Sequence, residues 1–104
     1  GEFEQFITNY FGYDKVIPMN TGVEAVETAI KLCRKWAYEI KGISKEKAKI
    51  IVCEGNFHGR TTTVISFSND PDSRNNFGPF TPGFETMILQ LWKRHCQIKM
   101  LLDF

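Results

Sequence analysis

The chain has 104 residues, of which 42% are hydrophobic and 13% aromatic, enough for the core of one modest domain. Its 13 basic and 12 acidic side chains leave a formal net charge of +1, so composition gives no electrostatic reason to expect nucleic acid or an acidic membrane surface as a partner. No stretch is long and apolar enough for a transmembrane helix, and the first residues lack the basic start and apolar run of a signal peptide.

The N-terminal segment predicts one helix and one short strand. Apolar side chains recur at helical spacing over residues 2–11, and Gly12 follows where a helix would stop. We expect this helix to pack against the domain rather than to form a site. Residues 16–19 predict a short buried strand, although Pro18 lacks the N–H that a central strand position needs.

The most strongly periodic segment of the chain covers residues 22–41. Its apolar positions lie three or four residues apart, as in a helix with one buried stripe: Val26, Ala29, Ile30, Cys33, Trp36, Ala37 and Ile40. Thr21 and Glu24 have the spacing of a capping box at its start, and Gly42 stands where a left-handed residue would end it. The sequence therefore marks both ends of this helix.

The start of this helix is a candidate anion site. The first backbone N–H groups of a helix have no intrahelical partner, and the helix dipole adds to their attraction for a phosphate. Here these groups belong to Gly22 and Val23, and the glycine lets a ligand approach the backbone closely. The alternative is an ordinary capped helix without a ligand, which the carboxylate of Glu24 slightly favours.

Residues 48–53, AKIIVC, form a continuous apolar run typical of a strand covered on both faces. A strand at 16–19, a helix at 22–41 and this strand have the spacing of a βαβ unit, whose right-handed crossover makes the strands parallel. We therefore predict an α/β fold. Residues 61–68 have strand composition, whereas residues 69–83, rich in Asn, Asp, Gly and Pro, predict a long loop.

Residues 54–60, EGNFHGR, follow the predicted strand at its carboxyl end, where open α/β sheets place their ligand crevices. Phe57 would stack on a flat cofactor, and Arg60 would hold a carboxylate through two parallel hydrogen bonds. The alternatives are that Phe57 belongs to the core and that His58 is a solvated or hydrogen-bonded loop histidine.

The three cysteines are far apart and have no CxxC or CxxH spacing. This pattern argues against a disulfide framework and a zinc site, and we predict no metal site. Cys33 and Cys53 lie in apolar runs, so we expect buried, reduced thiols there. A reducing compartment follows, with the cytoplasm as our expectation and the mitochondrial matrix as the alternative.

Three segments in this order, MNTGVEAVETAIKLCRKW, KIIVCEGNFHGRT and FGPFTPGF, closely resemble the large domain of the class III pyridoxal-phosphate aminotransferases of fold type I. The resemblance spans residues 3–85. The second and third segments are shared with the acetylornithine and 4-aminobutyrate aminotransferases, whereas the first is more similar to the ornithine aminotransferases. The family also implies a short helix at residues 61–66, which we prefer to a strand there.

The resemblance implies roles for the candidate residues. The phosphate of pyridoxal 5′-phosphate would be bound by three consecutive residues, Thr21, Gly22 and Val23. Phe57 would stack on the pyridine ring of the cofactor. His58 would lie beside the substrate, and Arg60 would receive the α-carboxylate of the substrate.

The reaction that the resemblance implies is transfer of the δ-amino group of ornithine to 2-oxoglutarate, in a homodimer whose partners are small amino and 2-oxo acids. The family uses a lysine that forms a Schiff base with the cofactor. No lysine of this chain stands in a motif like the family's glycine-flanked one, so we predict no catalytic residue here and expect the chain alone to be inactive.

The resemblance divides the chain into residues 1–86, a partial cofactor-binding large domain, and residues 87–104, a tail unlike the family. The tail is basic and partly amphipathic, which leaves a membrane-surface helix as one interpretation. Shifting the coding frame back by one nucleotide allows a sequence that resembles the next part of the family. Our hypothesis is therefore a frameshift or an altered gene end near residue 86.

Two other kinds of function remain open from the sequence. One is a non-catalytic module that captures a phosphorylated ligand at residues 21–23. The other is an interaction fragment that docks on a partner through helix faces that a small sheet leaves uncovered.

Overall fold

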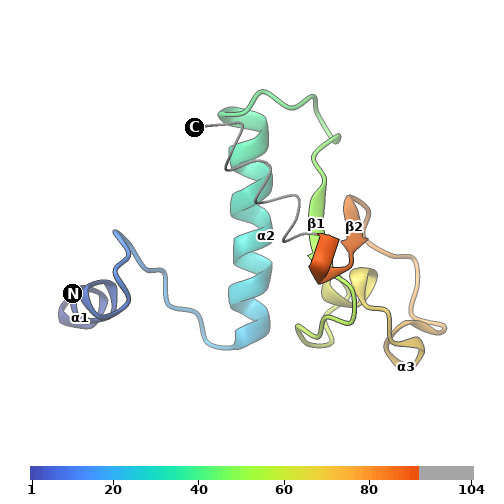
Figure 1. Ribbon diagram of the computed structural model, residues 1–104, viewed down its shortest axis with the longest axis horizontal. Helices are drawn as coiled ribbons and strands as arrows, with labels where there is room; N and C mark the ends of the chain where they lie inside the picture. The colour runs from blue at the N-terminus through green and yellow to red at the C-terminus, as the bar shows by residue number, and fades with distance from the viewer. Residues whose placement is uncertain (92–104) are drawn as a thin grey trace.

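A computed structural model describes residues 1–91 of the chain. Its elements in order are α1 (Glu2–Phe11), α2 (Gly22–Glu39), β1 (Ile50–Cys53), the short 3₁₀ helix η1 (Val64–Phe67), α3 (Pro71–Arg74) and β2 (Phe84–Met87). In Figure 1, α2 stands at the centre, with the strands and η1 on one side and α1 on the other. The predicted α/β class is confirmed: helices accompany a small parallel sheet.

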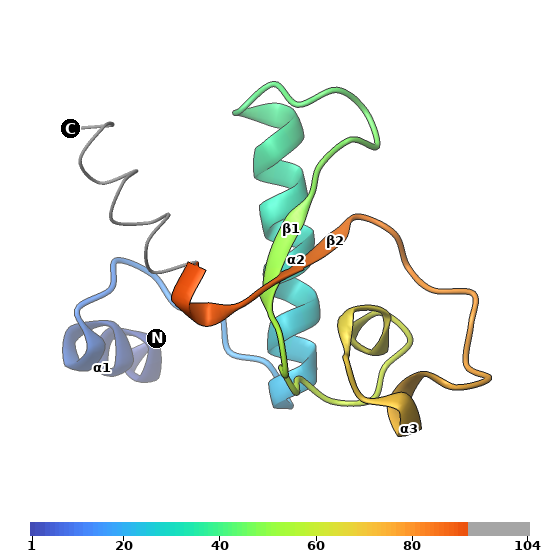
Figure 2. The same ribbon diagram turned by 45° about the vertical axis from the view of Figure 1, so that its right-hand side comes forward.

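Helix α1 forms over the predicted residues but packs against little. Gly12 ends it in the left-handed conformation, at φ 75°, and donates its N–H to the carbonyl of Thr8. No residue of α1 is buried, and Figures 1 and 2 both show the helix set apart from the rest of the described chain. The expectation that it packs against the domain is therefore wrong for residues 1–91.

The strand predicted at residues 16–19 is absent from the structure. This segment makes no ladder with any described strand, and only Val16 is partly buried. Pro18 offers no N–H for pairing, and the one ladder of residues 1–91 joins β1 to β2. The βαβ unit predicted around α2 is therefore wrong, although a parallel strand pair does exist.

Helix α2 begins and ends close to its predicted bounds. The hydroxyl oxygen of Thr21 accepts the N–H of Glu24 at 3.2 Å, which confirms the cap, and Gly42 is left-handed at φ 76°. Its apolar stripe is buried only near the middle, since Ile30 is 7% exposed but Ile40 is 74% exposed. The far end of the stripe has no cover among the described residues.

Strand β1 lies within the predicted run and pairs in parallel with β2, with Ile50 opposite Phe84 and Cys53 opposite Met87. The strand alternates between partly buried and exposed residues, and Ile51 is 50% exposed. The prediction of a strand covered on both faces is therefore wrong. The sequence analysis also did not predict β2, a four-residue strand that directly follows a segment with the composition of a loop.

Both cysteines that we expected to be buried are exposed and free. Cys33 lies on α2, and Cys53 ends β1. Each belongs to an apolar run, but the described residues cover only one face of the strand and only the middle of the helix. Apolar neighbours in the sequence were therefore not enough to bury these two cysteines.

The core lies between α2, the sheet and η1. Its most buried cluster consists of Ile30, Val64 and Phe67, and the Phe67 ring lies 4.5 Å from that of Phe84 in β2. The family implied a short helix at residues 61–66, and the structure has the short 3₁₀ helix η1 at Val64–Phe67, which overlaps that range, and no strand there. Because β1 runs opposite to α2, the loop that follows the strand reaches the start of the helix, as both views show (Figures 1 and 2).

The predicted tail, residues 87–104, falls mostly outside the described residues, since the structure describes nothing beyond residue 91. Within residues 1–91 no helix is long and apolar enough to cross a membrane.

Candidate functional site

The start of α2 and the loop after β1 line one open hollow of about 530 Å³. Its lining residues come from these two segments alone: Gly22, Val23, Val26, Phe57, His58, Gly59 and Arg60. Five of the six residues singled out from the sequence are therefore brought together. The sixth, Thr21, is the cap that immediately precedes Gly22 and does not line the hollow.

Gly59 allows the loop to touch the helix. Its φ of 124° is a conformation that side chains disfavour, and a Cβ at this position would lie 2.9 Å from both Cβ and Cγ2 of Val23. Any larger residue would push the loop away from α2. Sequence reasoning noted a glycine-containing loop here but did not single out Gly59, since the contact with Val23 spans 36 positions of the chain.

Two backbone donors at the start of α2 have no hydrogen-bond partner in the part of the chain that the structure describes. The N–H groups of Gly22 and Val23 make no hydrogen bond with any of residues 1–91, whereas the N–H of Glu24 is taken by its cap. A Cβ on Gly22 would meet nothing within 4 Å, so a ligand has open access to the backbone there. Unpaired donors at the positive end of an 18-residue helix fit a phosphate group.

Thr21 is engaged differently from its neighbours. Its oxygen accepts the N–H of Glu24, and its hydroxyl lies 3.1 Å from the Glu24 carboxylate, to which it donates. The side chain is therefore occupied by the capping box. A contact from Thr21 to a phosphate would require the hydroxyl to leave the carboxylate.

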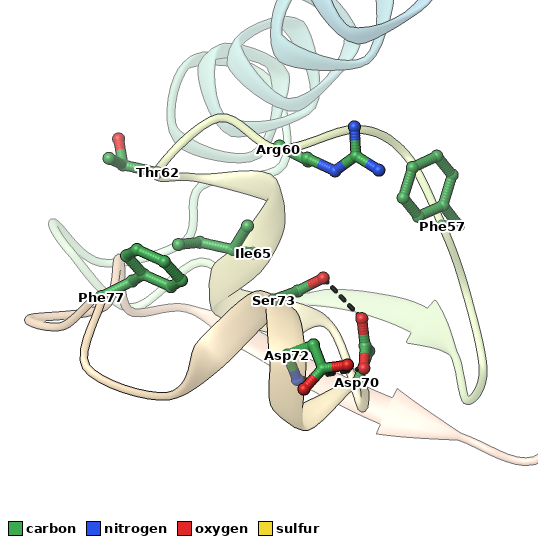
Figure 3. Close-up of a pocket in the computed structure, with 8 residues that line it drawn as sticks. All are labelled: Phe57, Arg60, Thr62, Ile65, Asp70, Asp72, Ser73 and Phe77. Carbon is green, nitrogen blue, oxygen red and sulfur yellow. Dashed lines mark hydrogen bonds between the residues drawn. The ribbon is translucent and has the colours of Figure 1, made fainter.

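The loop presents an aromatic ring beside a cation. Phe57 is 69% exposed, so it does not belong to the core, and the guanidinium carbon of Arg60 lies 5.8 Å from its ring centroid. Figure 3 shows the two side chains reaching toward one another above η1. The exposed His58 turns its ring edge-to-face against buried Phe67, with centroids 5.9 Å apart. An exposed aromatic ring and a neighbouring guanidinium suit a flat, anionic ligand.

Hydrogen bonds hold both ends of this loop. The side-chain amide of Asn56 donates to the carbonyls of Cys53 and Phe67, at 2.7 and 2.9 Å. At the far end, the hydroxyl of Thr61 donates to the carboxylate of Glu27 on α2 at 2.6 Å. Sequence reasoning missed these anchors, because their partners lie 11 and 34 residues away.

Arg60 and Phe57 also border a second hollow of about 510 Å³, shown in Figure 3. Across it, Asp70 caps α3. The hydroxyl of Ser73 and the N–H of Asp72 donate to its carboxylate and hold the pKa of Asp70 below its ordinary value, with a smaller contribution from the Arg60 charge. Arg60 therefore borders both the hollow that contains Asp70 and the hollow at the start of α2.

No group of three or more histidine, cysteine or acidic side chains within residues 1–91 is arranged to hold a metal ion.

The family model "Aminotransferase class-III" matches residues 1–99. The chain belongs to the class III aminotransferases. Among curated proteins of this family it is 61% identical over 87 residues to mitochondrial ornithine aminotransferase of Rattus norvegicus, a match that covers 84% of this chain and 20% of the relative. The resemblance inferred from the sequence is confirmed, and the chain spans about a fifth of the length of the relatives it matches.

Solved aminotransferases share the fold. Two crystal structures of ornithine aminotransferase from Toxoplasma gondii superpose with a TM-score of 0.83 at 53% identity, covering 86% of this chain and 21% of theirs. One of them, crystallised with oxidised glutathione, has partial occupancy of pyridoxal phosphate at its active site. Acetylornithine aminotransferase from Elizabethkingia anophelis superposes at 0.59 with 65% identity, over 86% of this chain and 20% of its own. The described residues thus match one part of the aminotransferase fold.

Proposed function

We propose that residues 1–86 are the part of an ornithine aminotransferase that binds the phosphate and the ring of pyridoxal 5′-phosphate. One observation carries the proposal: the free donors of α2 and the exposed ring of Phe57 line the same hollow. The similarity to ornithine aminotransferases supports the choice of cofactor and substrate.

The phosphate would bind at the start of α2. The N–H groups of Gly22 and Val23 would donate to its oxygens, and the dipole of the helix, about half a positive charge at this end, would add to the attraction. Thr21 would contribute its hydroxyl once it releases Glu24.

The loop would hold the remaining parts of the ligands. Phe57 would stack on the pyridine ring, His58 would lie beside the substrate, and the guanidinium of Arg60 would bind the substrate α-carboxylate through two hydrogen bonds. When bound, the cofactor supplies the electron sink that moves the δ-amino group of ornithine to 2-oxoglutarate.

No lysine of residues 1–91 lines this hollow. We therefore propose that the 104-residue chain orients the ligands but does not turn them over, and that the complete site requires further parts of the family's enzyme, including its homodimer. The chain has small amino and 2-oxo acids as partners, with no role for nucleic acid or a membrane. We propose the cytoplasm as the compartment, and the mitochondrial matrix as the alternative because the rat relative is mitochondrial.

The amino donor has a second candidate. The 65% identity with acetylornithine aminotransferase of Elizabethkingia anophelis is as high as that with the ornithine enzymes, which favours N-acetylornithine as an alternative substrate class. Binding of ornithine, N-acetylornithine and 4-aminobutyrate to the cofactor-loaded chain would be compared by calorimetry. Tighter binding of either of the last two would reject ornithine as the donor.

The test of the proposal is direct titration with pyridoxal 5′-phosphate, followed by its absorption and circular dichroism. We expect saturable binding that inorganic phosphate competes away. Phe57→Ala should weaken binding about 3- to 10-fold, as expected for the loss of one aromatic contact. Phe11→Ala, which removes a ring from α1 that is also mostly exposed, is the matched control. Equal effects of the two substitutions, or no saturable binding, would reject the proposal.

A further inference from the structure

Two contacts fasten the segment that carries Arg60 along the first turns of α2. Gly59 abuts Val23, and the hydroxyl of Thr61 donates to the carboxylate of Glu27 at 2.6 Å. Both members of the second pair are partly buried. The two contacts flank Arg60 in the sequence, one residue before it and one after it.

The two contacts lie one helical turn apart on α2. Val23 and Glu27 are four residues apart, a rise of about 6 Å. Their partners in the loop, Gly59 and Thr61, are two residues apart. Arg60 lies between these two partners and borders both hollows.

Thr61 joins three elements rather than two. Its oxygen lies 3.5 Å from the N–H of Val64, and its carbonyl accepts the N–H of Ile65, so the same residue starts the η1 turn. The bond to Glu27 has the length of a hydrogen bond from a hydroxyl to an ionised carboxylate, the stronger class of such bonds.

We infer that Glu27 and Thr61 are positioning residues, which set the distance between the phosphate-binding start of α2 and the Phe57–Arg60 loop without touching the cofactor themselves. This inference rests on the proposed function and adds two residues to which the sequence analysis assigned no role. Its consequence is specific. Breaking the pair should leave the phosphate donors of Gly22 and Val23 in place but misalign the ring-stacking loop.

The test separates these two halves of the site. The affinities of the 104-residue chain for pyridoxal 5′-phosphate and for inorganic phosphate would be measured, and their ratio compared between variants. Thr61→Val keeps the shape of the side chain but removes the hydroxyl, so the ratio should fall about tenfold while phosphate affinity stays constant. Thr61→Ser retains the hydroxyl and should keep the wild-type ratio. Thr86→Val, on an exposed strand position, is the matched control.

A double-variant cycle adds a second readout. If the pair acts as a unit, Glu27→Ala combined with Thr61→Val should lower the ratio no further than either substitution alone. A merely structural role would lower the affinities for the cofactor and for phosphate together and leave their ratio unchanged, and it would overturn the inference. If the variants keep the wild-type ratio, positioning by this pair is also rejected. If the wild-type chain shows no preference for the cofactor over phosphate, the proposed function fails, and this inference fails with it.

Discussion

Replacement of Gly59 by alanine should damage the site more than any other single-methyl change in the loop. The added Cβ would lie 2.9 Å from two carbon atoms of Val23, closer than real Cβ atoms approach, and the backbone φ of 124° suits only glycine. Either the loop moves away from α2 or the helix start shifts. In both cases the hollow between them opens.

The size of the effect follows from two separate costs. Holding a non-glycine residue in so sparsely populated a backbone region costs about 1–3 kcal/mol. Forcing an extra methyl into close-packed surroundings costs about 1–3 kcal/mol more. Gly55→Ala provides the comparison, because Gly55 is left-handed at φ 72° but a Cβ there would meet nothing within 4 Å. That variant should incur only the backbone cost, about 1–2 kcal/mol.

Urea unfolding followed by far-ultraviolet circular dichroism would give the free energy of unfolding of each variant, and titration with pyridoxal 5′-phosphate would give its affinity. We expect Gly59→Ala to lose more stability than Gly55→Ala and to bind the cofactor more weakly. Equal losses in the two variants would refute the reasoning, because they would leave no energetic cost for the contact with Val23.

Ile30→Ala should destabilise the chain by about 2–3 kcal/mol, since Ile30 is buried in the core cluster, whereas Ile40→Ala, at a residue 74% exposed, should cost less than about 0.5 kcal/mol in the same urea assay. Thr21→Ala should cost about 1 kcal/mol by uncapping a first-turn N–H of α2, measured by thermal unfolding. Asp70 has its pKa lowered chiefly by the hydroxyl of Ser73, so its stabilising effect is complete above the ordinary value of 3.8 and is lost as pH falls through the lower folded-state pKa. Ser73→Ala should raise the Asp70 pKa in an NMR titration.

Each of these predictions has an outcome that contradicts it. Equal losses at Ile30 and Ile40 would mean that the cluster between α2 and η1 is not the core. Unchanged stability in Thr21→Ala would mean that the cap is not formed in solution. An Asp70 pKa that is the same with and without the Ser73 hydroxyl would remove the stated cause of its shift.

Helices α1 and α2 could be predicted because their information is local. A periodic apolar pattern, a capping residue and a glycine stop act within a few residues of one another, and these signals agree with the observed bounds. The residues of the candidate site were named for the same reason, since Gly22 and Phe57 belong to short motifs that a family resemblance could carry. The contacts that bring the two together join a residue of one motif to a residue of the other, and neither motif marks them.

The failures all concern long-range partners. Residues 16–19 have the composition of a strand but no ladder, while β2 pairs with β1 across more than 30 positions of sequence. The apolar neighbours of Cys33 and Cys53 predicted burial, yet the exposure of each side chain depends on which segments cover it. The sequence shows which side chains prefer burial but not which segments will cover them.

The sequence by itself determined the α/β class, the two long helices with their caps, the family and the chemical types available for binding a phosphate, a ring and a carboxylate. Only the tertiary structure decided that the start of α2 and the Phe57–Arg60 loop share one hollow, and that Gly59 and Thr61 hold them together. The physical reason is that the backbone hydrogen bonds of a helix and the bonds that cap it act between near neighbours in the chain. The contacts of Gly59 with Val23 and of Thr61 with Glu27 join residues 36 and 34 positions apart, and they exist only once the chain has folded.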